Sequence, residues 1–336
     1  MPATIYDVAR RAGVSIATVS RVLRRSAPVQ DETRRRVEDA VSELGFVPSR
    51  LGVSLAERRH AANGVVFPDL SGPYFAEVVL GYEEVTSRLG RSVLILSTRE
   101  QADVDATVRD LTSRVDGLAV FDGTVGEEMV RSIAAGGLPV VLLARRDVDG
   151  ADSVTAENTR SAERLTEHLL GHGHRRLAFL GDPDHSFDVK ERWAGVRAVL
   201  GRHRLAPAGP FPCASAEGSA RAAATALLAS GDRPDAIVCG NDERALATLL
   251  AAEDLGLAVP GDVAVTGWDD IMAARHARPA LTTVRQPMRE LGAWAARALD
   301  ERIGGRRTTP RKELLPTQLV VRASCGHHHH HHKEER

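Results

Sequence analysis

The residues from Ser15 to Arg21 combine side chains that can read the edges of DNA bases. Hydroxyls and a guanidinium make hydrogen bonds to base edges and phosphates, whereas small apolar side chains contact the methyl group of thymine. A helix is narrow enough to enter the major groove with the residues near its N-terminus foremost. The DNA-contacting residues predicted in this stretch are Ser15, Ile16, Ala17, Thr18, Ser20 and Arg21.

Three short helices are predicted to hold this stretch in place. Thr4 and Asp7 have the spacing of a capping box, and Gly13 can adopt the left-handed conformation of a tight turn. A helix pair this small needs a cover, and the periodic segment from Asp31 to Leu44 supplies a third helix. Its inward side is predicted to consist of Val37, Ala40, Val41 and Leu44. These three segments make a helix-turn-helix unit.

The charge distribution favours contact with DNA at this end of the chain. Residues 1–60 contain eleven Arg, no Lys and seven acidic residues, a net charge of +4, whereas the whole chain carries −1. Such an asymmetry is expected when one end meets phosphate and the other does not. A packed helical hairpin used for dimerisation is the alternative that these residues leave open.

From residue 62 onward, short apolar runs alternate with amphipathic segments. The runs begin at Gly64, Ser92, Gly117, Pro139, Leu177, Ala236 and Val263. Continuous β-branched runs separated by helices indicate buried parallel strands, so we expect an α/β fold with two doubly wound subdomains. Open sheets of this kind bind ligands at the C-terminal ends of their strands.

Polar and aromatic residues follow several of these runs. Asn241 and Asp269 come directly after two of them, and a paired amide and carboxylate recognise vicinal hydroxyls well. Tyr74 and Phe75 begin a helix after the first run, where an aromatic face can stack on a sugar or a base, and Asp122 follows "GLAVF". Capping of the next helix by the polar residues, and core packing of the aromatic ones, are the alternatives.

The run "TIYDVARRAGVSIATVSRVL", followed by "TRRRVEDAVSELGFVPS", resembles the N-terminus of the lactose/galactose repressor (LacI/GalR) family of bacterial transcription regulators. The order of the remaining chain follows the family up to Cys325. The resemblance implies a homodimer or tetramer on pseudopalindromic double-stranded operator DNA. It also implies a two-lobed domain of the periplasmic-binding-protein type, with crossings between the lobes near Glu157, Pro287 and Glu313 and a small effector between them.

Several residue roles follow from this resemblance. "KERWAGV" matches a family motif whose arginine contacts effector, which assigns Arg192, with Asp188 beside it and Phe187 as a stacking candidate. In the family, a hinge leucine wedges the centre of the operator open, and Leu55 takes that position. A plain linker is the alternative for this segment. Thr4 and Arg24 complete the predicted DNA-binding set.

The sequence departs from the family at a few positions. Gly52 and Val53 stand where alanine and arginine are common, so one basic contact is absent there. Arg24 replaces a common asparagine and can still bind phosphate. Glu157 stands where the family often has an aspartate, which is expected to alter the shape of the ligand site.

These observations define four segments. We expect a helix-turn-helix DNA-binding domain over residues 1–48, a hinge over 49–61, and a two-lobed effector-binding and dimerisation domain over 62–326. Residues 327–336, with six histidines, read as an affinity tag and cloning remnant. The mixture of Tyr74, Arg192, Asn241 and Asp269 favours a polyhydroxylated effector such as a mono- or disaccharide, with nucleosides and purines as the alternative.

Other function classes find little support. There is no G-x-G-x-x-G after a strand, no GxxxxGK and no GxSxG, so we expect no enzyme, and in particular no Rossmann-type oxidoreductase. The three cysteines form no CxxC, so neither cofactor nor metal is expected. No apolar run is long enough for a membrane span and no signal region is visible, which predicts a cytoplasmic protein without a membrane partner and disfavours an exported sugar-binding protein without a DNA role.

Overall fold

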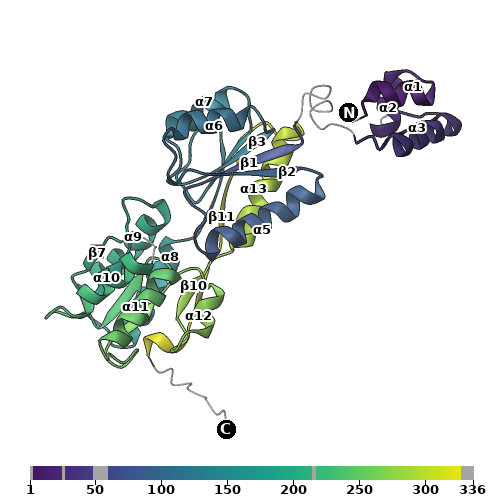
Figure 1. The fold of residues 1–336 in the computed structure, drawn as a ribbon. Helices are drawn as coiled ribbons and strands as arrows, with labels where there is room; N and C mark the ends of the chain where they lie inside the picture. The colour runs from purple at the N-terminus through teal and green to yellow at the C-terminus, as the bar shows by residue number, and fades with distance from the viewer. Residues whose placement is uncertain (1–2, 25–26, 48–59, 214–216, 327–336) are drawn as a thin grey trace, which may run out of the picture. The chain divides into compact units, whose positions relative to one another are not determined.

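The computed structural model describes residues 3–24, 27–47, 60–213 and 217–326. The chain divides into two compact units, Met1–Ala61 and Ala62–Arg336, and each has its own hydrophobic core (Figure 1). Residues 48–59, which contain most of the predicted hinge with Leu55, lie outside the described residues.

The smaller unit is a three-helix bundle of α1 (Ile5–Ala12), α2 (Ile16–Arg24) and α3 (Asp31–Leu44). The predicted capping box is present, because the Thr4 hydroxyl accepts from the Asp7 amide while the Asp7 carboxylate accepts from the Thr4 amide at 3.0 Å. Gly13 ends α1 in the left-handed conformation, with φ of +65°. The helix-turn-helix prediction is therefore confirmed.

The core of this unit contains one fully buried valine from each helix, namely Val8, Val19 and Val37. The predicted inward position of Leu44 is wrong, since 36% of this residue is exposed. The chain reverses at Gly45, where the Phe46 amide bonds the Val41 carbonyl at 3.0 Å, and Phe46 packs against the core there in place of Leu44.

The first lobe of the larger unit contains a six-stranded parallel sheet of order β11-β5-β4-β3-β1-β2. Its strands are β1 (Ala62–Phe67), β2 (Ser92–Ser97), β3 (Gly117–Phe121), β4 (Val140–Leu143), β5 (Asp152–Ala156) and β11 (Lys312–Leu315). Helices α5 (Pro73–Arg88) and α13 (Met288–Ile303) cover one face, and α6 (Val104–Thr112) and α7 (Glu127–Ala135) cover the other (Figure 1).

Helices α5 and α13 approach each other at two glycines. A Cβ atom on Gly81 would lie 2.0 Å from the backbone oxygen of Arg289, and one on Gly292 would lie 2.0 Å from that of Val78. Both distances are far below van der Waals contact, so the backbones can come this close only because neither residue has a side chain.

The second lobe contains a four-stranded parallel sheet of order β7-β6-β8-β9 and an antiparallel pair, β10 with β12. Its strands are β6 (Leu177–Leu180), β7 (Ala208–Phe211), β8 (Ala236–Cys239), β9 (Ala264–Thr266), β10 (Thr283–Arg285) and β12 (Gln318–Val320). Its helices are α8 (Thr159–Gly171) and α9 (Phe187–Arg202) on one face of the sheet, α10 (Glu217–Leu228) and α11 (Asp242–Asp254) on the other, then α12 (Met272–His276) and a short 3-10 turn at Ala323–Cys325.

The chain crosses between the lobes three times. It passes from β5 to α8 at Glu157 and from β10 to α13 at Pro287, as the sequence predicts. The third crossing lies at Pro316 and Thr317, near Glu313 as predicted, and directly after β11, in which Glu313 pairs with Val154. Three connecting segments between two lobes allow a hinge motion of one lobe against the other, and they restrict sliding of the lobes.

Candidate effector cleft and DNA-binding face

A cavity of about 600 Å³ lies between the two lobes of the larger unit. Its walls are built from the ends of strands in both sheets, the position that open α/β sheets favour for ligands. All the predicted effector-binding residues line this cavity: Tyr74, Phe75, Asp122, Asp188, Arg192, Asn241 and Asp269. Phe187 does not line it. The structure thus brings together residues that are distant in sequence, and their contact with an effector stays a prediction.

Arg192, on α9 of the second lobe, is 5% exposed and lines the cavity. Its Nε donates to Asn158 Oδ1 at 2.8 Å, and its Nη1 donates to the Gly240 carbonyl at 2.7 Å. Its Nη2 lies 3.4 Å from Asp188 Oδ2, one turn earlier on α9. The guanidinium also stands over the ring of Trp268, 4.6 Å from the ring centroid, so both its edges and its face are fixed.

Two buried carboxylates face this region of the cavity. Desolvation raises the pKa of Asp188 to about 6 and that of Asp269 to about 7, and Arg192 counteracts part of both shifts. Asp269 Oδ1 accepts from Gln286 Nε2 at 2.6 Å. The backbone of Asp269 has φ of +118°, a conformation that costs energy for a residue with a side chain and that directs this carboxylate from the end of β9.

The first lobe contributes an aromatic wall. The Phe75 ring meets Phe121 edge to face at 5.5 Å and Phe67 at 5.6 Å, so it belongs to both the core and the cavity lining. The Tyr74 hydroxyl is buried and finds no hydrogen-bond partner within the described part of the chain. Burial and the carboxylates of Asp188 and Asp269 raise the pKa of this hydroxyl well above its usual range, so it is a neutral donor.

Three acidic or amide side chains already have partners in the protein. Asp122 Oδ2 accepts from the backbone amide of Phe187 at 2.8 Å, which links the first lobe to the N-terminus of α9. Asn241 caps α11, since its Oδ1 accepts from the Arg244 amide at 3.1 Å. Glu157 does not line the cavity, and its two carboxylate oxygens instead accept from the amides of Arg160 and Ser161 at the start of α8. Glu157 thus does not line the cavity directly, and its effect on the shape of the ligand site stays a prediction.

Sequence reasoning missed several polar residues of the cavity lining. Glu243 and Arg244 follow Asn241 in the first turn of α11, and a capped helix start at a strand end could have indicated them. Asp182 and His185 lie in the loop after β6, where the histidine bonds the carboxylate at 2.8 Å. No local sequence pattern indicates Gln286. It lines the cavity because it lies in the segment that crosses between the lobes after β10.

In the smaller unit, α2 presents the predicted DNA-contacting side chains. Ser15 caps the helix, since its Oγ accepts from the Thr18 amide at 3.2 Å and lies 2.9 Å from the Thr18 hydroxyl. Ile16, Ala17 and Arg21 are exposed, whereas Thr18 and Ser20 are half-buried. An exposed isoleucine at the first turn of a helix is suited to contact with a partner. Contact of these residues with DNA stays a prediction.

The other predicted DNA-binding residues are Thr4, Arg24 and Leu55. Thr4 is exposed but its hydroxyl donates to the Asp7 carboxylate at 2.6 Å within the capping box. Arg24 ends α2, and its side chain lies outside the described residues, as does Leu55. Tyr6, on α1, is 62% exposed.

The raised pKa of Asp269 predicts a particular dependence of stability on pH. The folded protein holds this proton up to about pH 7, whereas the unfolded carboxyl titrates near 3.8, so the stabilising contribution is present at acid pH and is lost as the pH rises through 7. Compared with the wild type, Asp269→Asn should therefore gain stability on going from acid to neutral pH. Asp188 and Arg192 on α9, Asp242 and Glu243 on α11 and Tyr74 on α5 face Asp269. The Asp269 carboxylate raises the pKa of the buried Asp242, so the pKa of Asp242 should fall in the variant.

Urea unfolding of the wild type and Asp269→Asn at a series of pH values measures this difference. Asparagine tolerates positive φ better than most residues, which keeps the backbone of the variant unstrained. A difference in unfolding free energy that stays constant across the series would contradict the assignment of the raised pKa to Asp269.

Within the described ranges, no three metal-ligating side chains come together in a way that could hold an ion. In the same residues, no helix is both long and apolar enough to cross a membrane.

Residues 4–49 match the family described as bacterial regulatory proteins, lacI family, and residues 166–325 match the periplasmic binding protein-like domain. A helix-turn-helix unit in front of a two-lobed α/β unit with a cleft between its lobes is the architecture of a DNA-binding transcription regulator. The chain belongs to the lacI family of bacterial regulatory proteins.

Particular relatives match over nearly the whole chain. The catabolite control protein A of Priestia megaterium is 31% identical over 335 residues, covering 96% of this chain and 99% of that one, and its counterpart from Staphylococcus aureus is 29% identical with the same coverage. The lac repressor dimer bound to operator and the anti-inducer ONPF superposes with a TM-score of 0.88 at 29% identity, covering 97% of this chain and 100% of that chain. A complex of the transcriptional regulator CelR with cellobiose superposes with a TM-score of 0.72 at 30% identity, covering 96% and 99%.

Proposed function

We propose that this regulator is a homodimeric repressor whose affinity for operator DNA is controlled by a small polyhydroxylated effector, most simply a sugar, bound in the cleft. The observation that carries the proposal is the cavity between the lobes, lined by carboxylates, an amide, a guanidinium and aromatic rings. Carboxylates and amides accept and donate the hydrogen bonds of vicinal hydroxyls, and aromatic rings cover the apolar faces of sugar rings. The similarity to the CelR complex with cellobiose supports a sugar.

Two copies of the chain would place their α2 helices in successive major-groove segments of a two-fold symmetric site. Ile16 and Ala17 would set base preference by apolar contact and Arg21 by hydrogen bonds, while the segment around Leu55 opens the centre of the operator. This arrangement predicts a pseudopalindromic operator with a central CG step. Selection from random duplexes tests it, and enrichment of direct repeats, or equal affinity for scrambled DNA at fixed salt, would rule it out.

Arg21→Ala should weaken operator binding by about tenfold to a hundredfold if the guanidinium bonds a guanine, because one good bidentate contact accounts for about 1–3 kcal/mol of base discrimination. The loss should be largest for the preferred base and small for a mismatched site. Arg11→Ala is the matched control, since it removes the same charge from the same unit but from a residue paired with Glu43 at 2.6 Å. Fluorescence anisotropy with matched and mismatched duplexes measures both. A uniform loss across sequences, with a shallower salt dependence, would assign Arg21 to phosphate instead.

Effector control is tested in two steps. A thermal-shift screen with sugars, sugar phosphates, nucleosides and purines finds the ligand, because a ligand at about a hundred times its dissociation constant stabilises the folded state by about 2.7 kcal/mol. The hit is then titrated into the protein–operator complex. A change in operator affinity supports the proposal. The factor by which the effector changes the affinity for operator must then equal the factor by which operator changes the affinity for the effector. A ligand that binds in the cleft without changing operator affinity would contradict effector control.

Two alternatives correspond to definite outcomes of the same screen. A nucleoside or purine hit would assign the aromatic wall of Tyr74 and Phe75 to base stacking rather than to a sugar face. A sugar hit in a protein that binds no duplex of any sequence would leave a sugar-binding protein without a DNA role.

A further inference from the structure

The lining of the cleft carries a marked excess of negative charge. Six carboxylates and two guanidinium groups contribute to it, together with one histidine. The acidic residues are Asp69, Asp122, Asp182, Asp188, Glu243 and Asp269, and the basic ones are Arg192, Arg244 and His185. A ligand that enters a cavity with this balance is selected by its charge before any hydrogen bond forms.

The two guanidinium groups are largely committed to partners in the protein. Arg192 donates hydrogen bonds to Asn158, to the Gly240 carbonyl and to Asp188. Arg244 is 7% exposed and donates from both Nε and Nη2 to the Cys213 carbonyl, at 3.3 and 2.9 Å. Neither cation is therefore positioned as an open receptor for a phosphate or carboxylate group.

Asp122, Glu243 and Asp269 are the lining carboxylates that form no ion pair within the described ranges. Of these three, Glu243 and Asp269 lie near each other, since the charge of Glu243 raises the pKa of Asp269. Asp269 accepts from the Gln286 amide at 2.6 Å, and Glu243 accepts from the Asn241 amide at 3.2 Å. Throughout the described ranges, no basic nitrogen comes within 4.0 Å of either carboxylate. Carboxylates removed from water usually have a charged partner, so the buried Asp269 and the half-buried Glu243 are suited to bind a cationic group of a ligand.

An independent observation at the same place concerns Gln286. This residue is 4% exposed and lines the cavity, and its Nε2 is used by Asp269. Its Oε1 is buried and has no hydrogen-bond partner in the described part of the chain. A buried acceptor without a donor costs free energy, and a donor from a ligand would remove that cost. Apart from the Tyr74 hydroxyl, which is a donor, the polar groups left open at this end of the cavity are therefore acceptors.

We propose that the natural effector carries a protonated primary amine beside its hydroxyls, as an amino sugar does, and that the ammonium group binds at Asp269, Glu243 and Gln286. An ammonium offers three donors and a positive charge, which matches two carboxylates and one amide oxygen. Sugar phosphates are excluded from this cleft by the same charges. The proposal rests on the proposed function, since it names the chemical class of that effector.

The pKa of Asp269 supplies a second signature. Burial and the neighbouring carboxylates raise this pKa to about 7, against the opposing effect of Arg192, and an ammonium beside the carboxylate would lower it. Binding near neutral pH should therefore release a proton. A neutral sugar has no such effect.

Isothermal titration calorimetry of the full chain, without DNA, tests the proposal with matched sets of gluco, galacto and manno configuration. Each set contains the hexose, the hexosamine, the N-acetylhexosamine and the hexose 6-phosphate, and the corresponding β-1,4-linked disaccharides extend the gluco set. We expect one hexosamine or its disaccharide to bind at least about tenfold tighter than its neutral and acetylated counterparts. Its apparent enthalpy should change between two buffers of different ionisation enthalpy, which reports the released proton.

Asp269→Asn and Glu243→Gln are the variants. Each should bring the ratio of hexosamine affinity to hexose affinity toward one, even where the affinity for the hexose itself also falls. Glu243→Gln guards against a folding defect of the first variant. A hexose, acetylated sugar or phosphate that binds as tightly as its amine counterpart would overturn the proposal. So would the absence of any amine ligand with a dissociation constant below about 1 mM. Failure of effector control is a separate outcome, because it appears only when a ligand that binds the free protein leaves operator affinity unchanged.

Discussion

Gly81→Ala is expected to destabilise the larger unit by about 3 kcal/mol or more, at the upper end of what overpacking costs. The new methyl group would lie 2.0 Å from the backbone oxygen of Arg289 and 2.8 Å from its Cα. Neither atom belongs to a flexible side chain that could turn away. Helices α5 and α13 would have to separate, and with them the buried cluster that contains Tyr82 and Trp294.

Gly201→Ala is the matched control. Gly201 lies in α9, where a Cβ would meet nothing within 4 Å, so alanine there should be neutral or stabilise by up to about 1 kcal/mol through its higher helix propensity. Urea denaturation followed by circular dichroism measures both variants. Similar midpoints for the two variants would show that the helix pair can relax at no cost.

Arg192→Ala is expected to abolish the response to effector and to cost about 3 kcal/mol or more of stability, because it leaves a buried carboxylate and a buried amide without their partner. The Nε bond to Asn158 and the contact with Asp188 are both lost, and the Gly240 carbonyl loses its donor. Removal of the neighbouring cation also raises the pKa of Asp188 further. Unfolding by urea and operator release by the effector are the two measurements.

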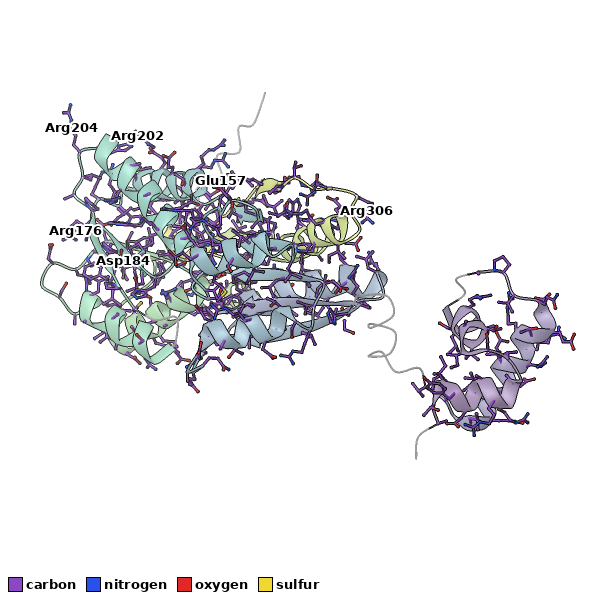
Figure 2. The ribbon with its side chains drawn as sticks, turned by 90° about the horizontal axis from the view of Figure 1, so that it is seen from above. Glu157, Arg176, Asp184, Arg202, Arg204 and Arg306 are labelled. Carbon is purple, nitrogen blue, oxygen red and sulfur yellow. The ribbon has the colours of Figure 1, made fainter. Side chains whose placement is uncertain are left out.

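Arg202→Ala separates a general effect of arginine removal from the specific one. Arg202 lies on the same helix at the periphery of the larger unit (Figure 2), with 52% of its side chain exposed and pairs to Glu163 and Glu167 at 3.3 to 3.4 Å. Exposed pairs of this kind contribute at most about 1 kcal/mol. Equal losses in the two variants, or an intact effector response in Arg192→Ala, would contradict the role assigned to Arg192.

The strands that were predictable from sequence are those whose side chains are buried on both faces. The run at Gly117–Phe121 is continuously apolar, and both faces of β3 are covered. Strands β5, β7 and β11 gave no such signal. The sequence of β5 begins with Asp152, which is fully buried only because Arg302 and Arg307, about 150 residues later, supply its partners. A pairing of this kind is set by tertiary structure, which no local pattern records.

The residues of the cleft also fall into those that the sequence predicts and those that only tertiary contacts define. Residues that directly follow an apolar run, such as Asn241 and Asp269, were predictable because strand ends gather at one edge of a sheet. Gln286 and Asn158 were not, since each lies at a crossing between lobes and becomes part of the site through contacts with Asp269 and Arg192. Family resemblance supplied Arg192 and Asp188, and the structure supplies the bonds that orient them.

The hydrogen bond from the Phe187 amide to Asp122 joins the two lobes through protein atoms alone, and Glu243 of the second lobe lies against Gly72 of the first. Any motion that opens the cleft further must break these contacts. For an effector too large to enter before that motion, the rate constant for association is the diffusional value multiplied by the fraction of time that the cleft stands open. Escape is limited by the same opening, so residence time on the protein, more than equilibrium affinity, would govern how long a transcriptional response outlasts its stimulus.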